Sequence, residues 1–142
     1  MRRMSIDYGD VRTGIALADP LGITVYGLET ITDYKNDKKI LKRVEEIVEE
    51  YGVTDIVLGM PYNENGTSGE RVEKTLAFKH KLKCKFNKLN IYEQDERYTS
   101  LWAEEEMIHL NVKKKNKKKV IDQLAAVNIL KTFNDNEKNR ID

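Results

Sequence analysis

Short β-compatible runs open the chain. Residues 3–8 and 13–18 are two such runs, and the turn-rich link between them, residues 9–12, has the length of a hairpin connection. A third run covers residues 25–31, soon after Pro20. Three strands in close succession predict an antiparallel meander.

The pattern then changes to helical spacing. Apolar residues recur at intervals of three and four, and Gly52 stands where a helix C-cap is expected. The periodic positions are Ile40, Leu41, Val44, Ile47, Val48 and Tyr51. The spacing predicts an amphipathic helix that ends at Gly52.

The next strand has an apolar centre. Residues 54–58 read as a strand in which Ile56, Val57 and Leu58 are unbroken by polar residues, as in a strand covered on both faces, and a polar loop follows as far as Gly69. Thr67 and Glu70 have the spacing of a capping box, which predicts the start of a second helix.

Two more helices and a strand complete the pattern. Residues 90–94 read as a strand, Thr99 or Ser100 as the cap of a helix that reaches Leu110, and residues 120–133 as the last helix. We expect one mixed α/β domain over residues 1–134, with a polar, frayed tail over 135–142.

Composition narrows the class of protein. The chain has 142 residues, 39% hydrophobic and 35% charged, with a net charge of +1. This balance indicates a soluble domain and argues against a uniformly basic nucleic-acid binder, although it leaves room for a local basic patch. Cys84 has no partner for a disulfide, and no zinc-binding or membrane pattern occurs. We therefore expect a cytoplasmic protein that does not bind membranes.

Four acids stand where catalytic carboxylates are often found. Asp7 ends the first strand, and Asp95 and Glu96 follow the strand at 90–94. Each also has a simpler interpretation, Asp7 as a turn residue and Asp95–Glu96 as partners of Arg97. Asp122 shares a helical stripe with the apolar side chains of the last helix, but it also suits the helix dipole as a first-turn acid.

Together the acids predict a metal site. Two strand-end acids and one helix acid can converge on a sheet that the last helix crosses, and converging carboxylates repel unless a cation lies between them. Hard oxygen ligands suit Mg²⁺ or Mn²⁺. Two such ions about 4 Å apart are a common device for cleaving phosphodiesters.

Four sequence blocks, in order, resemble the YqgF/RuvX family of bacterial Holliday-junction-resolvase-like proteins, which are also assigned as pre-16S rRNA nucleases. The blocks are residues 7–22, 59–67, 95–100 and 122–126. Small departures occur at Tyr98, Ser100 and Gln123, and none removes a carboxylate. The resemblance covers roughly residues 3–133. It implies a ribonuclease H-like fold, a mixed sheet flanked by helices, and a metal cage of Asp7, Glu96 or Asp95, and Asp122.

Several polar and basic side chains are candidates for substrate binding. The loop after the apolar strand offers Asn63, Asn65 and Thr67, and an ordinary polar loop is the alternative interpretation. Six lysines precede Asp122 and suit phosphate contacts, or else form a solvated charge run; they are Lys113, Lys114, Lys115, Lys117, Lys118 and Lys119. Arg12 and Arg97 are further candidates for clamping a phosphate, or pair with neighbouring acids.

The expected function is metal-dependent hydrolysis of phosphodiester bonds. The resemblance favours structured RNA, at the 5′ end of pre-16S rRNA, and branched DNA is the alternative. Junction cleavage would require a dimer for paired cuts, and we expect a monomer or a weak homodimer. We do not expect an actin- or sugar-kinase-like phosphotransferase, because 142 residues are too few for the two lobes that close over a nucleotide. A non-catalytic binding module is disfavoured because clustered acids would repel a polyanion.

Overall fold

The fold is a five-stranded mixed sheet with helices on both faces. A computed structural model of the chain describes residues 2–32, 37–62, 69–96 and 117–138. The strands are β1 (Arg3–Asp7), β2 (Arg12–Ala18), β3 (Val25–Thr32), β4 (Asp55–Met60) and β5 (Asn90–Asp95). The helices are α1 (Asp37–Tyr51), α2 (Glu70–Lys85) and α4 (Lys117–Lys138).

The strand order is β3-β2-β1-β4-β5, and it confirms the predicted meander. β1, β2 and β3 pair antiparallel, whereas β4 is parallel to both β1 and β5. Every residue of β4 is buried, as its unbroken apolar run predicted. The parallel arrangement brings the carboxyl ends of β1, β4 and β5 to one edge of the sheet.

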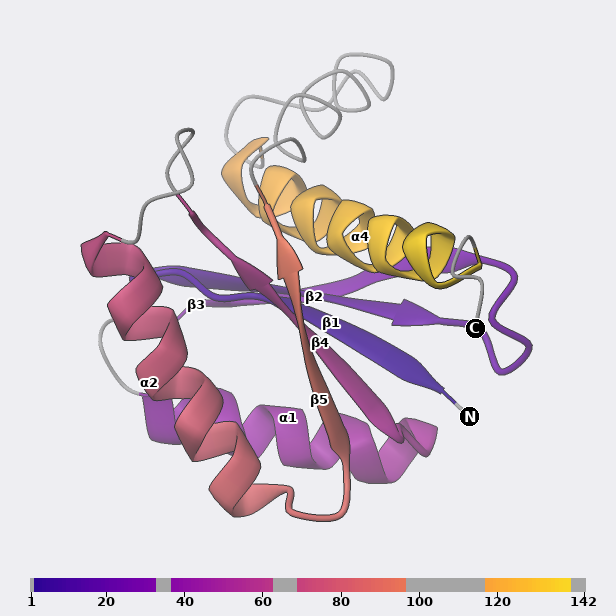
Figure 1. Cartoon of the computed structure of the whole chain (residues 1–142), viewed down its shortest axis with the longest axis horizontal. Helices are drawn as coiled ribbons and strands as arrows, with labels where there is room; N and C mark the ends of the chain where they lie inside the picture. Colours follow the sequence, from indigo (N-terminus) through magenta and orange to yellow (C-terminus); the bar gives the residue numbers. More distant parts are fainter. Residues whose placement is uncertain (1, 33–36, 63–68, 97–116, 139–142) are drawn as a thin grey trace.

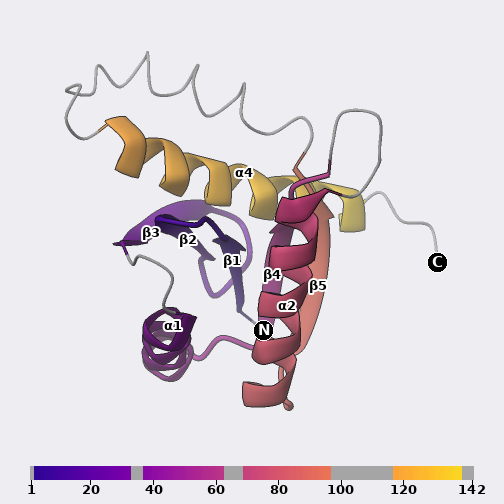
Figure 2. The same cartoon turned by 90° about the vertical axis from the view of Figure 1, so that its left-hand side faces the viewer.

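Helices cover the two faces unequally. α1 and α2 lie on one face and α4 crosses the other (Figures 1 and 2). The larger core lies between the sheet and the α1–α2 layer and includes Ile6, Val44 and Phe78. Smaller clusters lie beneath α4, with Ala16 packed against Ala126, and Val57 in the cluster that contains Ile129.

Small residues bring α4 close to the sheet. A Cβ atom added to Gly27 of β3 would lie 3.0 Å from the Cβ of Gln123. Ala16 of β2 and Ser5 of the central strand β1 are also small and fully buried. Because the α4-facing side of the sheet carries few large side chains, the helix backbone approaches the strands closely.

The sequence pattern predicted the end of α1 correctly and the start of α2 incorrectly. Gly52 follows α1 with a φ of 66°, and Val53 N–H donates to the Val48 carbonyl at 3.1 Å, which confirms the predicted glycine cap. The predicted capping box at Thr67 is wrong. α2 begins at Glu70, and its N-cap is Gly69 with no side-chain cap. Glu70 and Glu73 instead place negative charge in the first turn.

The last helix is longer than its apolar pattern predicted. It spans Lys117–Lys138 rather than residues 120–133, so the polar residues from Asn134 onward continue it instead of fraying at once. Asn134 is held by Arg3, whose guanidinium donates to the Asn134 amide oxygen at 2.9 Å. The helix predicted from Thr99 or Ser100 to Leu110 lies outside the described residues. No helix in the described part of the chain is long and apolar enough to cross a membrane.

A buried ion pair fixes the start of β4 to β1. Arg3 Nε lies 3.2 Å from an Asp55 carboxylate oxygen, and the Asn90 amide donates to the other oxygen at 2.9 Å. Asp55→Ala should lower the free energy of unfolding by about 3–5 kcal/mol, because it leaves the guanidinium largely buried without its counter-charge. Urea unfolding measures this change. Glu45→Ala, which breaks the more exposed pair with Lys85, is the control and should cost about 1 kcal/mol or less. Equal losses in the two variants would contradict the prediction.

Candidate active site

Two carboxylates meet at the carboxyl edge of the parallel strands. Asp7 is the last residue of β1, and Glu96 follows β5 directly. The Glu96 N–H donates to the Met60 carbonyl at 3.0 Å, so its backbone is held against the end of β4. The Asp7 and Glu96 side chains are hydrogen-bonded to each other. The structure therefore brings together acids that are 89 positions apart in the sequence.

Gly59 makes room for this pair. A Cβ atom at position 59 would lie 2.7 Å from Glu96 Cδ and 2.5 Å from Ile129 Cδ1. Both distances are shorter than real Cβ contacts allow. The Glu96 carboxyl therefore lies over the bare backbone of β4, with Ile129 of α4 beside it.

The pair does not carry two full negative charges at neutral pH. Burial, reinforced by the Asp7 charge and the hydrogen bond to Asp7, raises the pKa of Glu96 to about 10. Burial also raises the pKa of Asp7, while the hydrogen bond from Glu96 lowers it. A protonated Glu96 that donates a hydrogen bond to the Asp7 carboxylate agrees with the raised pKa of Glu96 and with the lowering of the Asp7 pKa by that bond. Two oxygen ligands held in contact with a proton between them are suited to exchanging that proton for a hard cation.

Arg71 is a site residue that sequence reasoning missed. It is the second residue of α2, and its positive charge lowers the pKa of both Asp7 and Glu96. One turn later, Lys74 Nζ lies 3.6 Å from Asp10 Oδ1, which places the start of α2 beside the β1–β2 turn. The available signal was its position in the first turn of the helix that follows the polar loop.

Tyr8 anchors the strand end that carries Asp7. Its ring stacks on Phe78 of α2, with centroids 4.2 Å apart, and its hydroxyl donates to Asp37 Oδ1 at 2.6 Å. Lys81 donates to the other Asp37 oxygen at 2.7 Å. Burial and the Asp37 carboxylate raise the pKa of Tyr8. The end of β1 is thereby tied to both α1 and α2.

The structure describes the other predicted acids, Asp95 and Asp122, in less detail. Of the two acids after β5, Glu96 makes the hydrogen bond to Asp7, while the negative charge of Asp95 raises the pKa of Glu96. Asp122 lies in the first two turns of α4, and its side chain is outside the described part. Ala126, Ile129 and Phe133 are buried against the sheet, so the predicted stripe is the face on which α4 packs. The described side chains contain no cluster of three or more potential metal ligands.

Most predicted substrate contacts fall outside the described residues. Arg12 begins β2, beside Thr32 of β3, and is partly exposed. Lys117, Lys118 and Lys119 belong to the first turn of α4, where only the backbone is described. The others lie in segments that the structure does not describe: Asn63, Asn65, Thr67, Arg97, Lys113, Lys114 and Lys115.

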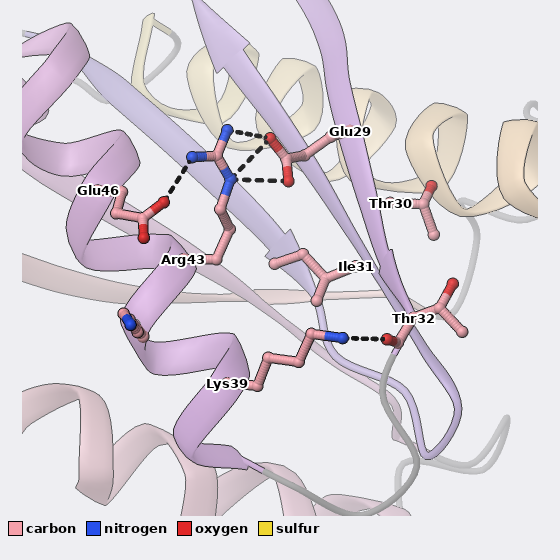
Figure 3. Close-up of a pocket in the computed structure, with 8 residues that line it drawn as sticks. Glu29, Thr30, Ile31, Thr32, Lys39, Arg43 and Glu46 are labelled. Carbon is pink, nitrogen blue, oxygen red and sulfur yellow. Dashed lines mark hydrogen bonds and ion pairs between the residues drawn. The ribbon is translucent and has the colours of Figure 1, made fainter.

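A groove of about 380 Å³ lies elsewhere, between β3 and α1 (Figure 3). Arg43 lies across it, with its guanidinium 2.6 Å from a Glu29 oxygen and 2.9 Å from a Glu46 oxygen (Figure 3). Ile31, which also lines it, packs in the core shared with α1, so the groove opens on the face away from α4. Its arginine is already neutralised, and the groove is separate from the carboxylate pair.

Comparison with known proteins gives a consistent result. Residues 1–136 match the family described as RuvX, Holliday junction resolvase. A protein of Acetivibrio thermocellus named "Putative pre-16S rRNA nuclease" is 46% identical over 138 residues, covering 96% of this chain and 97% of the relative. A protein of the same name from Ruminiclostridium cellulolyticum is 44% identical over 135 residues, covering 95% and 94%.

Solved structures share the fold at low sequence identity. Thermus thermophilus RuvC aligns with a TM-score of 0.59 at 14% identity, covering 97% of both chains. The yeast mitochondrial Holliday junction resolvase Ydc2 aligns with a TM-score of 0.53 at 13% identity, covering 91% of this chain and 75% of that one. The fold is therefore ribonuclease H-like, as the resemblance implied. With a match over nearly its whole length and relatives above 40% identity, the chain belongs to the RuvX family.

Proposed function

We propose that this chain is a divalent-metal-dependent nuclease that hydrolyses phosphodiester bonds in structured RNA, at the 5′ end of pre-16S rRNA. One observation carries the proposal. The Asp7–Glu96 pair is a buried, proton-sharing carboxylate pair at the carboxyl edge of parallel strands. A hydrolase needs such oxygen ligands, whereas a binding module gains nothing from buried acids that face a polyanion. The relatives named as pre-16S rRNA nucleases support the choice of RNA.

The donor set fits Mg²⁺ or Mn²⁺, because both residues in contact are carboxylates. Bound divalent ions, two in the proposal, would supply an activated water and stabilise the leaving oxygen. Asp7 and Glu96 would hold them, with the shared proton leaving to solvent, and Asp122 would complete the ligand set from α4, with Asp95 beside them. Arg71 supplies the fixed positive charge next to the pair and is suited to orient the scissile phosphate.

Substrate contacts away from the pair complete the proposal. Arg12 lies on the same sheet edge, and Arg97 and the lysines at 113–119 flank the acids in the sequence. They would bind the phosphate backbone without reading its sequence. Asn63, Asn65 and Thr67 would contact the nucleic acid from the loop before α2. We propose that the enzyme is cytoplasmic, because the exposed thiol of Cys84 is free and suits a reducing compartment. We also propose that it acts as a monomer or a weak homodimer.

Cleavage assays on two substrates test the function. Purified protein is offered a pre-16S rRNA fragment with its 5′ extension and a four-way DNA junction, with and without Mg²⁺ or Mn²⁺. We expect the RNA to be cut only when metal is present, and Asp7→Asn to yield no product because the pair loses an anionic ligand. Unchanged cleavage by Asp7→Asn would refute the site. Paired symmetric cuts in the junction, with the RNA intact, would establish the resolvase alternative. Binding of both without cutting would establish a binding module.

A further inference from the structure

A buried hydroxyl on β1, two residues before Asp7, bonds β1 to α4. Ser5 is fully buried, and its Oγ donates to the Ala126 carbonyl at 2.5 Å. Ala126 is also fully buried and packs against Ala16 of the neighbouring strand. A second hydrogen bond joins the same two elements at the other end of β1, where the Arg3 guanidinium donates to the Asn134 amide oxygen at 2.9 Å.

The position of this bond in the two elements is specific. Ser5 precedes Asp7 by two residues, so the two side chains lie on the same face of β1, about 7 Å apart along the strand. Ala126 follows Asp122 by four residues, so their positions are one helical turn, about 6 Å, apart on the same side of α4. The distance from Ser5 to Asp7 along β1 is therefore similar to the distance from Ala126 to Asp122 along α4.

We infer that Ser5 is a positioning residue for the proposed metal site: its hydrogen bond to Ala126 helps to set the register of α4 on β1 and thereby the level of Asp122 relative to Asp7. Small residues such as Ala16 and Gly27 let α4 approach the sheet closely. Directional hydrogen bonds then favour one register: Gln123 donates to Thr30 on β3, Arg3 donates to Asn134 near the end of α4, and Ser5 donates to Ala126 between them. The inference rests on the proposed function for its catalytic consequence.

Ser5→Ala removes the donor and leaves little else changed. The Ala126 carbonyl keeps its place in the helical ladder, so the loss of stability should be about 0.5–1.5 kcal/mol. Ile47→Val is the matched control, since it costs about the same but lies in α1, on the opposite face of the sheet. Any difference between the variants then reflects the register of α4 rather than stability.

Three measurements separate a positioning role from a merely structural one. Amide exchange in α4 should quicken in Ser5→Ala and not in Ile47→Val. The Kd for Mn²⁺, followed by electron paramagnetic resonance, should rise about 10- to 100-fold in Ser5→Ala alone, as for other residues that orient metal ligands. The kcat for RNA cleavage should fall by a similar factor, while KM changes less than about twofold because the backbone contacts are intact.

The outcomes distinguish this inference from the function on which it rests. If the wild-type protein binds Mn²⁺ and Ser5→Ala binds it equally well, the positioning role is refuted whatever the exchange data show. If exchange in α4 is the same in both variants, the register role is refuted. If the wild-type protein binds no Mn²⁺ and cuts nothing, the proposed function fails and the catalytic role of Ser5 fails with it.

Discussion

Glu96→Gln is expected to slow cleavage severely while making the metal-free protein more stable. The substitution keeps the size of the side chain and a hydrogen-bond donor toward Asp7, so the packing over Gly59 is preserved. It removes one of the two carboxylates that the proposal assigns to metal binding. We expect kcat to fall by about 10³-fold, at the upper end of what removal of one electrostatic group costs an enzyme.

The gain in stability follows from the raised pKa of Glu96. Its pKa is about 10 in the folded protein against an ordinary value of 4.5, so folding becomes less favourable as pH rises through this interval. Each pH unit costs the wild-type protein up to about 1.4 kcal/mol, and Gln pays none of this. The variant should therefore match the wild type near pH 4 and exceed it by a few kcal/mol at pH 8.

Urea unfolding at several pH values, without metal and with EDTA, measures this effect. Glu50→Gln, at the exposed end of α1, is the control and should change neither activity nor the pH dependence. Adding Mn²⁺ should stabilise the wild type and not Glu96→Gln. A variant that is less stable than the wild type at pH 8 would show that the carboxyl is not held protonated against Asp7.

Gly59→Ala should disable the site by a different route, through steric displacement. The new methyl group would overlap both Glu96 and Ile129, and β4 is buried throughout. Both the Glu96 carboxyl and the end of the Ile129 side chain must then shift. We expect a loss of about 1–3 kcal/mol in stability from overpacking and at least about 10²-fold in kcat from misplaced ligands.

Gly22→Ala is the control that separates the loss of stability from the loss of activity. Gly22 has a φ of 72°, so alanine is strained there, yet a Cβ at this position would meet nothing within 4 Å. The control should lose about 1–2 kcal/mol and keep full activity. Cleavage and thermal melting are measured on both variants. If Gly59→Ala retained wild-type kcat, the close packing of Glu96 over β4 would be irrelevant to catalysis.

Much of the fold was predictable because its signals are local. The spacing of Ile40, Val44 and Ile47 identified α1, and the unbroken apolar run of β4 identified a central strand. Gly52 marked the end of α1 because a positive φ has few other occupants. The start of α2 was mispredicted because Thr67 matched a capping pattern, whereas the chain enters the helix at Gly69 in an extended conformation.

The candidate site was predictable in its acids and not in its supporting residues. Asp7 and the Asp95–Glu96 pair were expected to converge with Asp122 because both strand-end positions and the first turn of the last helix can meet on one sheet. The hydrogen bond between Glu96 and Asp7 depends on how the chain leaves β5, where the Glu96 N–H donates to the Met60 carbonyl. Gly59, Arg71 and Ser5 act through partners 37, 64 and 121 positions away in the sequence, respectively Glu96, Asp7 and Ala126. No local pattern encodes such contacts.

The α4–sheet contact also has a consequence for the timing of activity during synthesis. Ile129 lies beside Glu96, and the hydrogen bond from Ser5 ends on Ala126, so the site depends on both the first strand and the last helix. A nascent chain whose residues 117–138 are still inside the ribosome therefore cannot assemble the site.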